Sequence, residues 1–151
     1  MIKIMFVCHG NICRSPMAEF LMKDLIKKDG REKDFLIQSS ATSYEEEGSP
    51  VHYRTRKILE KLNISCAGKR AVRLEKSDLT KYDYFIGMEE VNLKNIKRIL
   101  GDGVAEKTAL LLSFAGENRG VSDPYWTGDF EKTFEDVKRG VEALYNFLKK
   151  F

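Results

Sequence analysis

Residues 7–19 read VCHGNICRSPMAE, and this stretch joins two patterns of different kind. Before it, the run from Ile2 to Val7 is almost entirely apolar, as expected of a strand that is buried on both faces. After it, apolar residues recur at helical spacing, at Ala18, Leu21, Met22 and Leu25. The stretch therefore predicts a short polar loop between a core strand and the start of a helix.

Three residues set the expected limits of this first helix. Ser15 is predicted to be its N-cap, and Pro16 its first helical residue, where the missing N–H of proline costs nothing. Gly30 is expected to end it.

Farther along the chain, short apolar strands alternate with amphipathic helices. Three more strands are predicted at Phe35–Ser39, Tyr84–Met88 and Thr108–Leu112. Helices are predicted from about Val51, at 76–81, around 93–100 and over 130–151. The alternation predicts an α/β fold, a parallel sheet with helices on both faces. Ligands of such sheets bind beyond the carboxyl ends of the strands, where the loop at residues 8–15 would lie.

Composition limits the classes of protein to consider. A chain of 151 residues without repeats or linkers predicts a single domain over 1–151. The net charge is +3, from 26 basic and 23 acidic residues that are dispersed, so no nucleic acid partner is expected. No apolar segment is long enough for a membrane span or a secretory signal, so no membrane partner is expected. With three cysteines, an odd number, we expect reduced thiols and a cytoplasmic protein.

The loop has the residues of an anion site with a nucleophile at its mouth. Gly10 and Asn11 tolerate the backbone angles that turn successive amides toward one anion, and a helix start favours negative charge. Arg14 can offer two parallel donors to the same anion. Cys8 would then be held as a thiolate facing a bound phosphate, with Ser15 able to donate a hydrogen bond to its sulfur.

A second stretch, RGVSDPYWTGD at residues 119–129, could supply a proton donor. Asp123 before Pro124 would ordinarily be interpreted as a turn residue. Combined with the cysteine loop, it becomes a candidate general acid and base that protonates the leaving oxygen and then activates water. Tyr125 and Trp126 beside it could wall a slot for an aromatic ring.

CHGNICRS at residues 8–15 and DPYW at 123–126 together resemble the low molecular weight protein tyrosine phosphatases. The resemblance extends along the chain through GNICRSPMAE, IQSSATS, YDYFIGMEEVNL and SDPYWTGDFE. It implies a flavodoxin-like single domain with a central four-stranded parallel sheet, and hydrolysis of phosphotyrosine in proteins without a cofactor or a metal. His9 and His52, the only histidines, form no metal-ligand pattern.

The resemblance also implies roles for individual residues. Cys8 would be the nucleophile, Arg14 the clamp on the phosphate and Asp123 the general acid and base. The phosphate, or another oxyanion, would be bound by His9, Gly10, Asn11, Ile12, Cys13, Arg14 and Ser15. The loop would be braced by Asn11, Ser15 and Ser39. The substrate pocket would be walled by Ile12, Tyr44, Tyr125 and Trp126.

Several residues leave two interpretations open. Cys13 is either a small buried residue or, by the resemblance, a partner that forms a protective disulfide with Cys8 under oxidation. His9 either tunes the site or faces solvent. The run Glu45–Glu47 is either a solvated face or a rim that disfavours acidic phosphopeptides. Cys66 is expected to be structural. Lys69 aligns with a histidine of many relatives, and a protonated lysine cannot accept a hydrogen bond from the loop asparagine.

Three other functions would use a loop of this kind. A protein-arginine phosphatase of the same fold tends to carry threonine where Ile12 stands. An arsenate reductase needs further cysteines, and none follows Cys66. A non-catalytic phosphopeptide binder would not need both Cys8 and Asp123. The sequence thus predicts a phosphotyrosine phosphatase. A monomer is expected, and weak self-association is left open.

Overall fold

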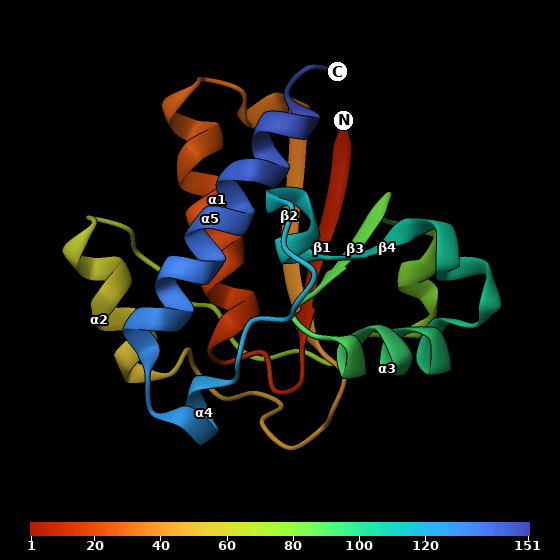
Figure 1. Ribbon diagram of the computed structural model, residues 1–151, viewed down its shortest axis with the longest axis horizontal. Helices are drawn as coiled ribbons and strands as arrows, with labels where there is room; N and C mark the ends of the chain where they lie inside the picture. Colours follow the sequence, from red (N-terminus) through yellow and green to blue (C-terminus); the bar gives the residue numbers. More distant parts are fainter.

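The computed structural model describes residues 1–151 and contains one four-stranded parallel sheet with the strand order β2-β1-β3-β4. In Figure 1 the chain begins in the middle of this sheet, with β1. The strands are β1 (Ile2–Cys8), β2 (Phe35–Ala41), β3 (Tyr84–Gly87) and β4 (Thr108–Leu110). The predicted flavodoxin-like α/β fold is confirmed.

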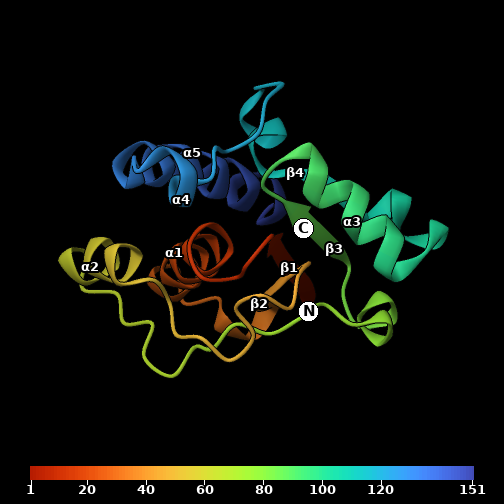
Figure 2. The same ribbon diagram turned by 90° about the horizontal axis from the view of Figure 1, so that it is seen from below.

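Helices cover both faces of the sheet, as Figure 2 shows in the view from below. One face carries α1 (Arg14–Lys28) and α5 (Phe130–Leu148), with α2 (Tyr53–Lys61) beside α1, and the other carries α3 (Glu90–Leu100). The short helix α4 (Pro124–Thr127) precedes α5. Four 3-10 turns complete the chain: η1 (Glu32–Asp34), η2 (Lys76–Thr80), η3 (Asp102–Lys107) and η4 (Leu111–Ala115). None of these helices combines the length and apolar composition that crossing a bilayer requires.

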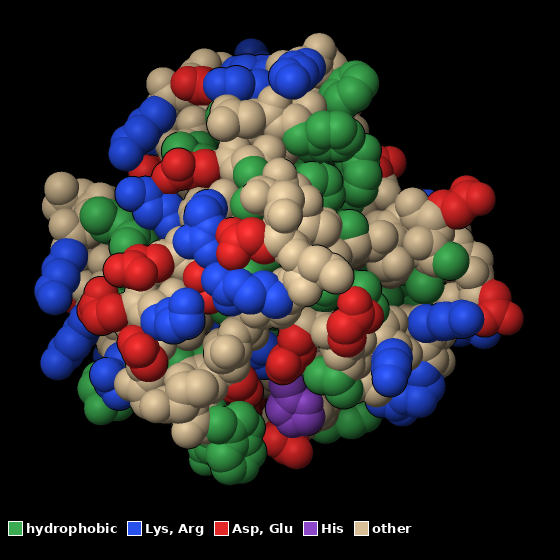
Figure 3. Space-filling view, in the orientation of Figure 1, with side chains coloured by type: hydrophobic (Ala, Val, Ile, Leu, Met, Phe, Trp, Pro, Cys, Tyr) green, Lys and Arg blue, Asp and Glu red, His purple; other side chains and the backbone are tan.

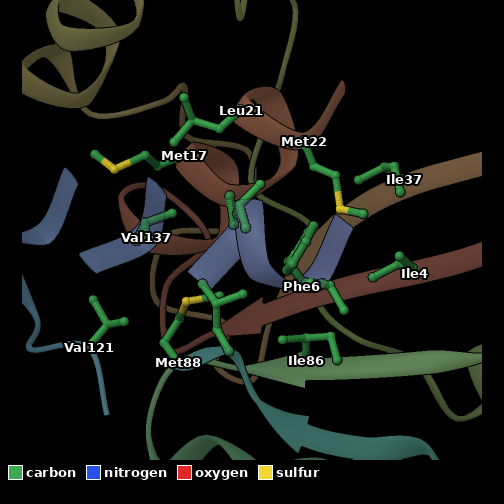
Figure 4. Close-up of a cluster of buried hydrophobic side chains, with 14 of the residues drawn as sticks. Ile4, Phe6, Met17, Leu21, Met22, Ile37, Ile86, Met88, Val121 and Val137 are labelled. Carbon is green, nitrogen blue, oxygen red and sulfur yellow. The ribbon is translucent and has the colours of Figure 1, made fainter. Parts of the chain in front are cut away.

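Strand β1 distributes its side chains between two apolar cores, which explains its unbroken apolar run. Ile4 and Phe6 point into the larger core under α1 and α5, whereas Met5 and Val7 point into the smaller one under α3. Figure 4 shows Phe6 among side chains from the helices and from neighbouring strands, such as Met22 and Ile86. Each such buried side chain contributes about 1.5–3 kcal/mol to folding. Burial on both faces therefore fixes β1, and with it the position of Cys8 at its carboxyl end.

The first helix begins two residues earlier than the sequence predicts. Its first residue is Arg14, and Cys13 is the N-cap without a side-chain cap bond, so the prediction of Ser15 as N-cap is wrong. The Ser15 hydroxyl lies 3.0 Å from Cys8 Sγ instead, because the first turn of the helix is folded against the loop. The predicted end holds: the helix stops at Lys28, and Gly30 takes the positive φ of 67° that glycine adopts readily.

The fourth strand is shorter than predicted. It ends at Leu110, and the apolar residues that follow form η4 rather than continuing the strand. Leu111 packs closely on α5, where a Cβ on Gly140 would lie 2.5 Å from its Cγ. An apolar run alone could not distinguish a strand end from a buried turn.

Candidate active site

The loop after β1 forms the floor of a cavity at the carboxyl end of the sheet. The cavity has a volume of about 710 Å³ and also receives residues from the segment after β2, from the start of α3 and from α4. In Figure 1 these segments meet at the lower edge of the molecule, and Figure 3 shows acidic side chains around a histidine along that edge. The predicted position of the site beyond the strand ends therefore contains a real cavity.

Cys8 lies at the end of β1 with two hydrogen-bond donors aimed at its sulfur. The Asn11 backbone N–H donates to Sγ at 3.3 Å, and the Ser15 hydroxyl lies 3.0 Å from it, in position to donate to a thiolate. Cys8 is only 3% exposed, but it lines the cavity. Donors fixed in this way stabilise negative charge on the sulfur.

Asn11 holds the loop in its curved shape. It takes the left-handed φ of 58°, which few residues other than glycine tolerate. Its side-chain amide donates to Ser15 Oγ at 2.8 Å and to Ser39 Oγ at 2.9 Å, while its Oδ1 accepts from the Val72 backbone N–H at 3.1 Å. The structure thus brings together the three residues expected to brace the loop, and it adds Val72, which the sequence did not indicate.

Arg14 is buried and ionically paired within the cavity. Its Nη1 donates to Glu89 Oε1 at 2.8 Å and to the Val121 carbonyl at 2.9 Å, and its Nη2 lies 3.3 Å from Asp123 Oδ2. Burial alone would lower the pKa of Arg14, but the nearby Cys8, Asp123 and Glu89 together raise it above its ordinary value. The guanidinium therefore stays charged and has a fixed orientation.

Asp123 serves at the same time as a turn residue and as a site residue. Its Oδ1 accepts from the Tyr125 backbone N–H at 3.0 Å, which caps α4, while its Oδ2 faces Arg14. The cap bond sets the direction of the carboxyl group, so that one oxygen points into the cavity. A sulfur nucleophile, a fixed cation and a carboxyl group therefore line the same cavity.

The model of the protein family described as low molecular weight phosphotyrosine protein phosphatase matches residues 3–151 of the chain. The chain belongs to this family. A Bacillus subtilis low molecular weight protein-tyrosine-phosphatase, YfkJ, is 36% identical over 99% of this chain and 97% of its own, and its crystal structure superposes with a TM-score of 0.96. PtpA of Staphylococcus epidermidis is 38% identical over 99% of this chain and 96% of its own. SP-PTP of Streptococcus pyogenes is 38% identical, covers 98% of this chain and 93% of its own, and has a TM-score of 0.88. The family is one of cysteine-dependent phosphatases.

In this phosphatase Lys69 supports the loop in a way that the sequence did not predict. Its Nζ donates to the Ser39 carbonyl at 2.9 Å and lies 3.6 Å from the buried Glu19 carboxylate, which in turn accepts from Ser39 Oγ at 2.5 Å. Burial lowers the pKa of Lys69, and the charge of Glu19 partly offsets this. Lys69 therefore does not have to accept a hydrogen bond from Asn11. It holds Ser39 in place, and Ser39 Oγ accepts the hydrogen bond from the Asn11 side chain. The sequence feature that could have indicated this arrangement is Glu19, a charged residue within the apolar pattern of α1.

The remaining predicted residues of this phosphatase divide between the cavity and its surroundings. Ile12, Cys13, Tyr125 and Trp126 line the cavity, and the last two are 63% and 81% exposed. His9 lies at the rim, with Nε2 3.1 Å from Glu45 Oε2. Tyr44 does not line this cavity: its ring faces the Arg73 guanidinium at 4.5 Å, beside a neighbouring groove. Four further residues line the cavity although the sequence analysis assigned them no role in the site: Glu89, Val91, Ser122 and Thr127.

Proposed function

We propose that this phosphatase hydrolyses phosphotyrosine in proteins, and small aryl phosphates, through a cysteinyl-phosphate intermediate. The observation that carries the proposal is the convergence of Cys8, Arg14 and Asp123 on one cavity, with Arg14 Nη2 3.3 Å from the Asp123 carboxylate. The loop amides and Arg14 would bind the phosphate, and inorganic phosphate or another oxyanion would occupy the same place.

The reaction would proceed in two displacements at phosphorus. In the first, the Cys8 sulfur attacks phosphorus, the bond to the tyrosine oxygen breaks, and Asp123 gives its proton to that oxygen. In the second, the Asp123 carboxylate takes a proton from water, the water oxygen attacks phosphorus, and the sulfur leaves. Arg14 stabilises the charge on the equatorial oxygens in both steps, and Ser15 hydrogen-bonds to the departing sulfur.

The aromatic rim supports phosphotyrosine as the substrate. Tyr125 and Trp126 lie edge to face, with ring centroids 5.2 Å apart, beside the carboxyl group that would protonate the leaving oxygen. Ile12 adds an apolar surface on the loop side. Of the four residues expected to wall the pocket, these three support the proposal and Tyr44 does not, because its ring faces Arg73.

The first experiment compares two peptides of identical sequence, one with phosphotyrosine and one with phosphoarginine at the same position. We expect faster phosphate release from phosphotyrosine at matched concentrations and mildly acidic pH. Faster release from phosphoarginine would leave the roles of Cys8 and Arg14 intact, and it would overturn the assignment of the substrate and of the aromatic rim.

Cys13 is proposed to protect Cys8 against irreversible oxidation. Burial, with Cys8 and Asp123 nearby, raises the pKa of Cys13 to about 12, so Cys13 is a neutral thiol at physiological pH. After peroxide converts Cys8 to a sulfenic acid, the Cys13 thiol would displace its hydroxyl, forming a disulfide and releasing water. We expect Cys13→Ser to recover much less activity than the parent when thiol is added after peroxide. Equal recovery would exclude the protective role.

A further inference from the structure

A second groove lies beside the catalytic cavity, and it carries the opposite charge. This groove, here called the basic groove, has a volume of about 820 Å³ and is formed by the segments 44–48 and 70–76 and by α3. In Figure 2 the segment after α2 runs past the end of β2 toward the side of the sheet that α3 covers. The charged residues that line the basic groove are Arg70, Arg73, Lys76 and Arg98, together with Glu47 and Glu75.

The four cations of the basic groove are not paired with carboxylates. Arg98 donates only to the Asn95 side chain, at 3.3 Å, and Arg70 and Lys76 are exposed. Elsewhere in the chain some arginines are neutralised, as Arg119 is by Asp136 at 2.9 Å. Glu47 and Glu75 also line the groove, but neither lies within salt-bridge distance of these cations. Four cations against two carboxylates in one concave surface raise the local concentration of anions.

Arg73 gives the basic groove a fixed cation. Its Nη1 donates to the Leu74 carbonyl at 2.5 Å, and its guanidinium lies over the Tyr44 ring at 4.5 Å. Its Nε is buried and has no hydrogen-bond partner within the chain. A guanidinium held in this way loses less side-chain entropy on binding than a free one does.

The basic groove and the catalytic cavity share one wall. Glu45 and Glu46 line the catalytic cavity, whereas Tyr44 and Glu47, on either side of them in the chain, line the basic groove. A peptide that leaves the cavity across this wall therefore enters the groove. Glu89 and Asp123 also line the catalytic cavity, and Arg14 is the only Lys or Arg residue there. The carboxylates therefore outnumber the cation, and the mouth of the cavity repels acidic side chains.

We propose that the basic groove binds an acidic segment of the phosphoprotein substrate while the phosphotyrosine occupies the catalytic cavity. This inference rests on the proposed function and deepens it. Acidic residues directly beside the phosphotyrosine meet the glutamates of the shared wall and are disfavoured. Acidic residues farther along, beyond a short neutral spacer, reach Arg70, Arg73, Lys76 and Arg98. The selectivity of this phosphatase thus depends on the position of acidic residues and not on their number.

The test uses two phosphotyrosine peptides with a spacer of about three neutral residues, followed by four glutamates in one and four glutamines in the other. Because both carry the same phosphotyrosine, the ratio of their kcat/KM values isolates the contribution of the distant charges. We expect the parent to prefer the glutamate peptide by about threefold to tenfold at low salt, and less at high salt. The spacer is built on each side of the phosphotyrosine in turn, and we expect the preference on one side only.

The double variant Arg70→Gln/Arg98→Gln should bring this ratio close to one. The matched control, Lys61→Gln/Lys94→Gln, removes the same charge from exposed positions outside the groove and should keep the parental ratio. A parent without preference, or a control that loses it as fully as the groove variant, would overturn the proposal.

Failure of the proposed function would look different. In that case the parent would not release phosphate from either peptide. The Kd values of the two labelled peptides are then measured by fluorescence anisotropy with the parent and both variants, and their ratio replaces the ratio of kcat/KM values. Equal Kd values for the two peptides would overturn the groove proposal independently of catalysis.

Discussion

Replacing Cys8 with serine is expected to lower kcat for a phosphotyrosine peptide on the order of 10⁴-fold or more. The reason lies in what surrounds the sulfur. The groups closest to Sγ are the Asn11 N–H and the Ser15 hydroxyl, both placed to donate hydrogen bonds. They are placed to stabilise negative charge on the sulfur, but neither can take a proton from a serine hydroxyl. A serine at position 8, a much weaker nucleophile than a thiolate, therefore has no base among the groups that hydrogen-bond to its side chain.

Cys66→Ser is the matched control for this variant, because it makes the same atomic change at a buried cysteine outside the cavity. We expect its kcat to stay within about twofold of the parent. Inorganic phosphate should still raise the Tm of Cys8→Ser, since Arg14 and the loop amides remain. Turnover by Cys8→Ser close to that of the parent would show that another group is the nucleophile. Loss of the phosphate effect on Tm would show that the loop had collapsed.

The fold could be predicted from the sequence largely because burial imposes simple periodicities. The apolar run of β1 and the spacing along α1 and α5 left few arrangements other than a covered parallel sheet. Boundaries were less predictable where a tertiary contact overrode the local pattern. Leu111 packs against Gly140 of α5, so β4 stops early although its sequence remains apolar.

Site residues in the two motif stretches were accessible to sequence reasoning, since each had a chemical reason to be where it is. Residues that reach the site through the fold were not. Glu89 contacts Arg14 across 75 positions of the chain, and Val72 contacts Asn11 across 61. Their part in the site depends on the register of separate elements, which a single sequence does not specify. Tyr44 shows the converse: it directly follows the stretch IQSSATS, but its ring faces Arg73 and does not line the catalytic cavity.

Replacing Asp123 with asparagine is expected to lower kcat by about 10²–10⁴-fold, and the size of the loss should depend on the leaving group. An asparagine amide can still accept the Tyr125 N–H that begins α4, so the cap is retained. It cannot give a proton to the leaving oxygen. The loss should therefore be largest for a phosphotyrosine peptide or phenyl phosphate. It should be smaller for 4-nitrophenyl phosphate, whose leaving group departs without protonation.

Glu89→Gln separates proton transfer from the neutralisation of Arg14. Glu89 and Asp123 both contact the Arg14 guanidinium, at 2.8 Å and 3.3 Å, so each variant removes one negative charge from the same cation. Only Asp123 is also the N-cap of α4, the helix that contains Tyr125 and Trp126, beside which the leaving group would lie. If the carboxyl group of Asp123 acts as the acid, plots of log kcat against leaving-group pKa steepen for Asp123→Asn and keep the parental slope for Glu89→Gln. Equal slopes in all three proteins would mean that Asp123 only orients Arg14, and that the proton comes from solvent.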